Sequence, residues 1–346
     1  MWRESTPQAA RRPAARRDPG SSPIKTVLYI TGILGIGLAA YLIVDAGAET
    51  VLSAMATIGW GLVAVTLFHL LPMGLSTMSW REMFPIRQRL KFTVLIWARW
   101  IRESVNSLLP VGQVGGDVVC ARLIHLKGTP GPLSAATMIV DLTVGVLTQL
   151  TFIVLGLVLL VSQSTNPDIL EPVTNILFGL ALVLCATFAF LFVQIRGFFG
   201  RMAHATSRLF GTTALIRMAS KVSEVDEAVG AIYARKRKLV RANLWRLAGW
   251  IAGTGEIWLL MQFLGKPVSL TEAFILESLG SGVRAIAFLV PGAIGVLESS
   301  YVVFGSMFGI APSDALAIAL GKRVREIALG VPGLAAWQIA EGRRLI

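Results

Sequence analysis

The sequence predicts an all-α polytopic membrane protein with about six transmembrane helices and two re-entrant helical hairpins. Its 346 residues are 54% hydrophobic and 15% charged, with a mean hydropathy of +0.68, whereas about a quarter of the residues in soluble domains are charged. Apolar runs of about 20 residues, the length that crosses a bilayer, recur along the chain. Two further apolar stretches contain proline, glycines and charges. These are costly against lipid, so we expect them inside the protein or along a polar cavity.

Residues 1–25 are polar and basic, and we expect a disordered cytoplasmic tail before a single integral membrane domain over 26–346. The first half of this domain, 26–163, opens with an apolar run that is long enough to be a span. The elements expected in this half are spans at 26–44, 58–80 and 133–161, and a hairpin at 92–127. The return arm of the hairpin, 116–127, has 12 residues, too few to cross a core of about 30 Å.

The second half begins after a fourth span at 173–193 and a basic insert at 196–246, which we place on the inner membrane face because its apolar residues recur at helical spacing. This insert holds eleven Lys or Arg and three acids. The elements expected in the second repeat, 247–340, are a fifth span at 247–264, a hairpin at 271–310 and a sixth span at 313–340. Within the second span, Pro72 and Gly74 are the expected kink positions.

The links between the spans differ strongly in basic residues. The tail, the 81–91 link, the basic insert and the C-terminus hold 23 Lys or Arg, whereas the intervening loops hold only Lys266. Positive residues stay on the cytoplasmic side of a membrane. Both termini are therefore predicted to be cytoplasmic.

The two broken stretches are similar to each other in sequence. Each has Leu-Leu or Leu-Val before a proline, two glycines three apart, an acid seven residues after the proline and an arginine seven or eight residues before it. Because three spans separate them, they would face opposite sides, as in inverted-repeat transporters with a site near the midplane. The expected hinge residues are Pro110, Gly112, Gly115, Gly116, Pro291, Gly292 and Gly295. The alternative is that these residues only kink ordinary packed helices.

Fourteen charged residues, seven acids and seven bases, are predicted within the membrane. An unpaired charge there costs about 2.5–3.5 kcal/mol, so these must pair or line a cavity. Lys322 and Arg323 are spaced to pair with Glu326 along one helix. A cavity lined by arginines suits an anionic headgroup. The candidate substrate-binding residues are Arg99, Arg102, Asn106, Gln113, Arg122, Arg284, Lys322 and Arg325. The acids expected to order the arginines or carry coupling protons are Glu103, Asp117, Asp141, Glu256, Glu298 and Glu326.

Enzyme chemistry is not predicted. The chain has no Walker loop, no GxSxG motif and no His/Cys cluster with metal-ligand spacing. The histidines are scattered and are interpreted as packed or interfacial residues, and the two cysteines have no CxxC spacing. We therefore expect no catalytic residue, no cofactor and no metal. We also expect no nucleic-acid partner, although the net charge is +12, because most basic residues flank apolar spans.

Two segments carry a family resemblance: RESVNSLLPVGQVGGD (102–117), followed by Asp141 in IVDLT, and PGAIGVLE (291–298). Over roughly 26–340 the chain resembles the lysylphosphatidylglycerol synthase transmembrane-region family, most closely its hopanoid-biosynthesis-associated members. Such modules are thought to translocate phospholipids or glycolipids between leaflets. Bifunctional relatives add an aminoacyl-transferase domain, which we do not expect here. The chain departs from the family pattern at Asp117, where glutamate is usual, and at Cys120, where arginine or serine is expected.

The resemblance implies a lipid flippase or transporter of the bacterial inner membrane that moves an anionic, hopanoid or glycosylated lipid. Two other classes stay open. One is an accessory or scaffold subunit of a lipid-synthesis complex, and the other is a small-solute or ion carrier. The expected partners are a membrane lipid and the bilayer. Among proteins, we would expect lipid-biosynthesis enzymes or a second copy of the chain.

Overall fold

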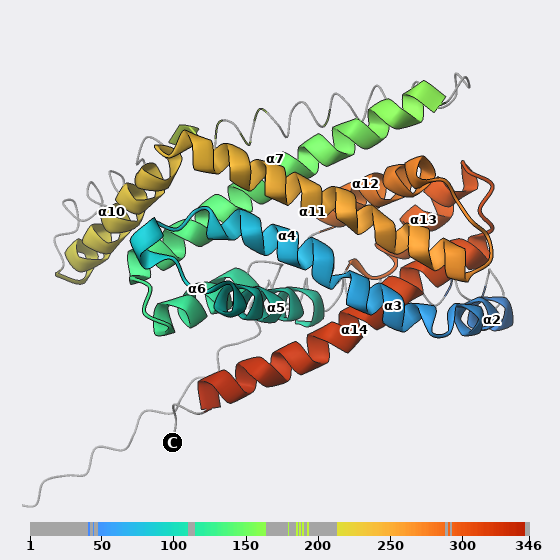
Figure 1. The fold of residues 1–346 in the computed structure, drawn as a ribbon, viewed down its shortest axis with the longest axis horizontal. Coiled ribbons are helices and arrows are strands. Elements are labelled where there is room, and N and C mark those ends of the chain that lie inside the picture. The colour runs from blue at the N-terminus through green and yellow to red at the C-terminus, as the bar shows by residue number, and fades with distance from the viewer. Residues whose placement is uncertain are drawn as a thin grey trace, which may run out of the picture.

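The computed structural model describes residues 48–109, 115–163, 213–287 and 293–342, together with Val290 and a few isolated positions between 41 and 193. Throughout these residues the fold is all α, as predicted (Figure 1). The elements are α2 (Ala48–Ile58), α3 (Gly61–Phe68), α4 (Leu70–Arg81), the short 3-10 helix η1 (Ile86–Gln88), α5 (Phe92–Leu108), α6 (Gly115–Leu126), α7 (Gly131–Gln163), α10 (Thr213–Tyr233), α11 (Lys236–Phe263), α12 (Leu270–Ile286), α13 (Val296–Ser306) and α14 (Pro312–Gly342).

The predicted second span is divided into α3 and α4 at His69. Pro72 explains the position of this break, because a proline lacks the N–H that would bond the carbonyl four residues earlier, here that of Phe68. The expected kink therefore falls one turn before the proline itself. Together α3 and α4 form one of two described segments long and apolar enough to cross a membrane, and α7 is the other.

Both broken stretches form two helices separated by a break. In the first, α5 packs against α6, and the two helices occupy the predicted hairpin at 92–127. In the second, α12 packs against α13 within the predicted hairpin at 271–310. A capping box between Ser269 and Glu272 fixes the start of α12. Whether either pair re-enters the membrane stays a prediction.

Three long helices form the frame of the fold: α7 with 33 residues, α11 with 28 and α14 with 31. At 1.5 Å per residue they extend over about 40–50 Å. The α7 helix contains the predicted third span. The α11 helix begins at Lys236, ten residues before the predicted end of the basic insert at 246. The basic residues in between do not stop the helix, because Lys and Arg are good helix formers. The count of six spans stays a prediction, since the expected spans at 26–44 and 173–193 lie outside the described residues.

The first helix of each hairpin packs against a long helix from the other half of the chain. The α5 helix lies against α14, and α12 lies against α7, while α4 runs along α11 (Figure 1). Glycines allow the close approach of the hairpins. A Cβ added at Gly330 of α14 would lie 2.5 Å from Leu108 of α5, and one at Gly156 of α7 would collide with Ser278 of α12. The two halves are therefore interleaved.

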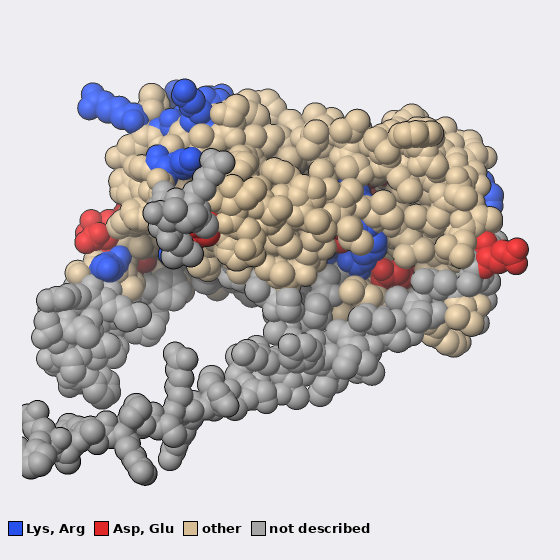
Figure 2. Space-filling model, turned by 90° about the horizontal axis from the view of Figure 1, so that it is seen from below, with Lys and Arg blue, Asp and Glu red and all other residues tan. Residues whose placement is uncertain are grey.

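Apolar side chains form two main buried clusters at opposite ends of the fold. One contains Val65, Ile257 and Ile318, and the other contains Trp80, Leu95 and Val140. Many large apolar side chains are also exposed, and Figure 2 shows a broad uncharged surface with charged atoms confined to a few patches. Large exposed apolar areas are characteristic of surfaces that contact lipid or other protein. Most of the buried charged residues lie between the two clusters.

Candidate functional site

A cavity of about 380 Å³ lies between the two halves of the chain. It is lined by α4, α5, α7, α11, α12, α13 and α14, so the first helices of both hairpins face it. Its volume is typical of sites for small ligands. The charged lining residues are Arg99, Arg102, Arg246, Arg284, Lys322, Arg325, Glu103, Glu256, Glu277 and Glu326. Trp100, Trp250 and Tyr301 add aromatic surface to the same wall.

The carboxylate of Asp141, on α7, is the centre of the first charged cluster and has 0% of its surface exposed. It forms an ion pair with Arg102, and it lies 3.7 Å from Arg99 Nη1 and 3.4 Å from Arg246 Nη1. A Cβ at Gly145 would lie 2.8 Å from Arg246 Nη2, so this glycine makes room for the guanidinium. One buried acid therefore holds three cavity arginines in position.

Arg102 also connects the two helices of the first hairpin. Its Nη2 lies 2.6 Å from Asp117 Oδ1 on α6. Nearby, Asn106 Oδ1 accepts a hydrogen bond of 2.8 Å from the Gly116 backbone N–H. A Cβ at Gly116 would collide with the Arg102 carbonyl oxygen. The helices meet so closely that only glycine fits at this position.

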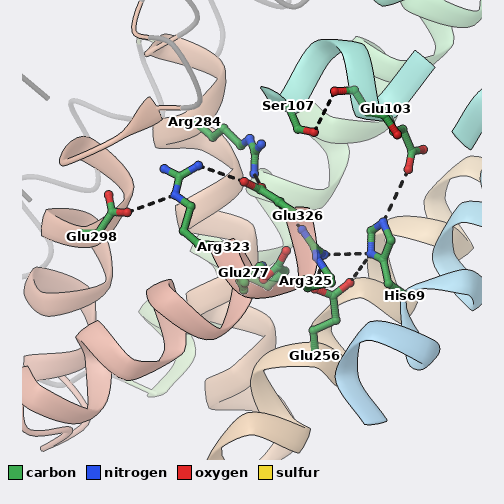
Figure 3. Close-up of polar contacts among 12 residues, drawn as sticks. His69, Glu103, Ser107, Glu256, Glu277, Arg284, Glu298, Arg323, Arg325 and Glu326 are labelled. Atoms are coloured by element: carbon green, nitrogen blue, oxygen red, sulfur yellow. Dashed lines mark hydrogen bonds and ion pairs between the residues drawn. The ribbon is translucent and has the colours of Figure 1, made fainter. Parts of the chain in front are cut away.

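The second charged cluster is built on α14 (Figure 3). Arg325 pairs with Glu256 of α11, and Lys322 pairs with Glu277 of α12. Lys322 Nζ also donates to the hydroxyl of Tyr301 over 3.1 Å. The predicted pair between Lys322 and Glu326 is therefore wrong, because the lysine reaches across to another helix.

Glu326 holds the arginines at the other end of this cluster (Figure 3). Its oxygens lie 2.6 Å from Arg284 Nη1, 2.9 Å from Arg323 Nη1 and 3.6 Å from Arg325 Nη2. The predicted pair of Arg323 with Glu326 is thus confirmed. Arg323 also lies 3.2 Å from Glu298 Oε1. The other carboxylate oxygen of Glu298 accepts the backbone N–H of Gly295, which has a φ of 79°.

His69 connects the two clusters. Its Nδ1 lies 2.6 Å from Glu256 Oε1, and its Nε2 lies 3.5 Å from Glu103 Oε2. Glu103 in turn pairs with Arg99 over 3.2 Å. His69 and Glu103 therefore connect the charged groups around Asp141 with those around Glu326, and the pair of Lys322 with Glu277 lines the same cavity. These groups are together called the network.

Most of the predicted site residues lie in this network. Those that line the cavity are Arg99, Arg102, Asn106, Arg284, Lys322, Arg325, Glu103, Glu256 and Glu326. Asp117, Asp141 and Glu298 lie behind the lining and pair with its arginines or with Arg323. Gly115 begins α6, and Gly295 directly precedes α13. Gln113, Pro110, Gly112, Pro291 and Gly292 lie outside the described residues.

Arg122 lies apart from the cavity. Its side chain is 63% exposed and pairs with Glu341 over 2.8 Å, at the far end of α14. The position of Arg122 on the return helix α6, after the break, explains why it does not share the cavity with Arg102. An exposed pair of this kind contributes little to stability, because water screens it.

Sequence reasoning missed four residues of the site. Glu277 is not among the predicted site residues. Arg246 is the last residue of the predicted insert at 196–246, whereas the structure places it within α11. His69 was interpreted as a packing residue, although its position three residues before a proline places it at a helix break. No pattern in the sequence pointed to Tyr301.

The network is electrically balanced over the described residues. It contains seven bases, which are Arg99, Arg102, Arg246, Arg284, Lys322, Arg323 and Arg325, and seven acids, which are Glu103, Asp117, Asp141, Glu256, Glu277, Glu298 and Glu326. Within the same ranges, no three His, Cys, Asp or Glu side chains are placed to hold a metal ion. The chemistry that this arrangement offers is the binding of a polar or charged group by exchange of ion-pair partners.

The family model described as "Lysylphosphatidylglycerol synthase TM region" matches residues 30–332, which is most of the chain. The chain therefore belongs to this family and is a membrane protein, as predicted. No curated protein and no solved structure matches it. The narrower association with hopanoids stays a prediction.

Proposed function

We propose that this member of the lysylphosphatidylglycerol synthase TM-region family is a lipid flippase or transporter, which moves an anionic, hopanoid or glycosylated lipid between the leaflets of the bacterial inner membrane. Family membership makes a role in lipid handling the expected class of function. The observation that carries the finer proposal is the charged cavity between the two hairpins. A lipid headgroup crossing the bilayer needs such a polar site, because a charged group in hydrocarbon is costly.

Reciprocal contacts between the two halves, of the kind expected for an inverted repeat, support this proposal. Each hairpin arginine, Arg102 or Arg284, pairs with an acid on the next long helix, Asp141 or Glu326. Each hairpin also packs against the long helix of the other half. Such reciprocal packing is expected when two repeats of opposite orientation enclose a central site and alternate its access between the two sides.

The cavity arginines would bind the headgroup phosphate, since a guanidinium presents paired donors that fit a phosphate. Arg284 is the best placed of them, because its side chain is 30% exposed and has one acid partner, Glu326. The acids would keep the arginines in position when no lipid is bound. The scaffold and ion-carrier alternatives do not require a headgroup to enter this cavity.

The test is reconstitution into liposomes that contain headgroup-labelled anionic, zwitterionic and polyisoprenoid-linked lipids. We expect the purified protein to accelerate leaflet exchange of at least one of them above empty vesicles. The matched variants are Arg284→Ala in the cavity and Arg122→Ala outside it, and only the first should slow the exchange. Exchange at the rate of empty vesicles for every lipid would favour the scaffold or ion-carrier alternative.

A further inference from the structure

One nitrogen of His69 faces two partners that make opposite demands. Its Nδ1 lies 2.6 Å from Glu256 Oε1 and 2.8 Å from Arg325 Nη1. A guanidinium only donates hydrogen bonds, and a carboxylate only accepts them. The nitrogen therefore satisfies the arginine when it carries no proton and the glutamate when it carries one.

The two protonation states of the ring hold different partners. In the neutral ring with its proton on Nε2, Nδ1 accepts from Arg325, and Nε2 faces Glu103 of α5. In the imidazolium, Nδ1 donates to Glu256 of α11, and Arg325 of α14 is left to its carboxylate partners Glu256 and Glu326. A proton on Nδ1, present in the imidazolium and in the other neutral tautomer, thus decides whether His69 contacts Glu256 of α11 or Arg325 of α14.

The location of His69 suits such a role. It lines the cavity, and its side chain is 20% exposed, so water and ligand can reach it. It occupies the break between α3 and α4, where the helix is interrupted. The charged groups that face it come from three helices: Glu103 of α5, Glu256 of α11 and Arg325 of α14. Arg99 lies one ion pair further away, through Glu103, and Lys322 lines the same cavity.

Because the charges of the network cancel, a proton on His69 changes the net charge of the cavity. Seven bases and seven acids cancel, so protonation of His69 gives the cavity one net positive charge. That charge favours an anionic headgroup. When one proton accompanies one anionic headgroup, no net charge moves across the membrane, and the cost of moving a lone charge is avoided.

We infer that His69 is the proton-binding site of the cavity and that its proton is carried together with an anionic lipid headgroup. This inference rests on the proposed function. When His69 is protonated, the cavity binds the headgroup, and when His69 loses the proton, the cavity releases the headgroup. Histidine is suited to this because its charge changes between about pH 5 and pH 8.

The test measures exchange of headgroup-labelled phosphatidylglycerol in phosphatidylcholine vesicles that contain the full chain. Between about pH 8 and about pH 5 we expect exchange by the wild type to rise by about tenfold. His69→Gln, whose amide both donates and accepts but does not titrate, should change by less than about twofold over the same range. The matched control is His125→Gln, since His125 lies on α6 and bonds the Thr129 carbonyl away from the cavity. It should keep the wild-type pH profile.

The outcomes separate the inference from the proposed function. No exchange by the wild type at either pH contradicts the proposed function. Exchange that is present but equally fast at both pH values contradicts the inference alone, as does a His69→Gln variant with the pH profile of the wild type.

A second measurement, the NMR titration of His69, does not depend on lipid transport. The chain has three histidines, so His125→Gln/His204→Gln leaves His69 as the single histidine for NMR. Its ring signals should shift with pH in parallel with the exchange rate, and a flat response would overturn the inference.

Discussion

Asp141 on α7 and Glu326 on α14 hold corresponding places in the two halves of the chain, and each contacts three arginines. They differ in their access to the cavity. Asp141 is fully buried behind the lining, whereas Glu326 is part of the lining. Within the described residues each acid is the single ion-pair partner of one arginine, Arg246 for Asp141 and Arg284 for Glu326, and the side chain of Arg246 is 10% exposed whereas that of Arg284 is 30% exposed. The comparison indicates that Asp141 anchors the cavity wall and that Glu326 takes part in exchanging partners.

The largest effect is expected from Asp141→Asn. The variant leaves three arginines around a neutral side chain, and breaking a buried pair in this way costs roughly 3–5 kcal/mol. Thermal unfolding of the purified protein in detergent should show a large fall in stability, together with reduced yield. Stability equal to that of the wild type would mean that Asp141 is not an anchor.

Glu326→Gln should mainly reduce leaflet exchange rather than stability. The arginine that loses its acid partner is then Arg284, which is more exposed than Arg246, so the loss of stability should be clearly smaller than for Asp141→Asn. Leaflet exchange should nevertheless fall by about tenfold or more, because the ordered position of Arg284 is lost and a charged hydrogen bond contributes about 1.5–3 kcal/mol. Normal exchange with reduced stability would reverse the roles given to the two acids.

Arg284→Lys tests the geometry of the pair between Arg284 and Glu326, and its effect on leaflet exchange should be smaller. An ammonium keeps the charge but lacks the paired donors of a guanidinium. Exchange should therefore lie between those of the wild type and Arg284→Ala, with little change in unfolding temperature. If lysine serves as well as arginine, the site needs only a positive charge at this position.

Arg122→Ala should have the smallest effect. Its exposed pair with Glu341 is outside the cavity, and water screens such pairs so that they contribute little to stability. Both exchange and unfolding temperature should stay close to the wild type. A large loss of exchange would show that the site extends along α6.

The sequence predicted the helix breaks better than it predicted the charge partners. Pro72 interrupts a helix by a local mechanism that a proline carries with it, and α5 ends at Leu108 and α12 at Ile286, each before one of the two predicted Pro/Gly stretches. The partners of Lys322 and Arg246 depend on which helices become neighbours. Glu277 lies 45 residues from Lys322, and Asp141 lies 105 from Arg246. Only helix packing decides between such distant partners and a nearby one such as Glu326.

The same distinction applies to His69. Its position at a helix break follows from Pro72, but its contacts with Glu103, Glu256 and Arg325 require three other helices to meet there. Sequence spacing carries no information about that meeting. The contacts of His69 therefore became visible only in the folded structure.

The central claim is that a lipid headgroup passes through the cavity between the two hairpins, and blocking the cavity tests it most directly. Cys120 and Cys185 are replaced by serine, and Ser107→Cys then places one thiol in the cavity lining. After reaction with a bulky methanethiosulfonate, leaflet exchange in liposomes should fall by about tenfold or more and return when the label is removed by a reducing agent. The same label on Arg122→Cys should have no effect. Full exchange with the cavity label in place would contradict the account.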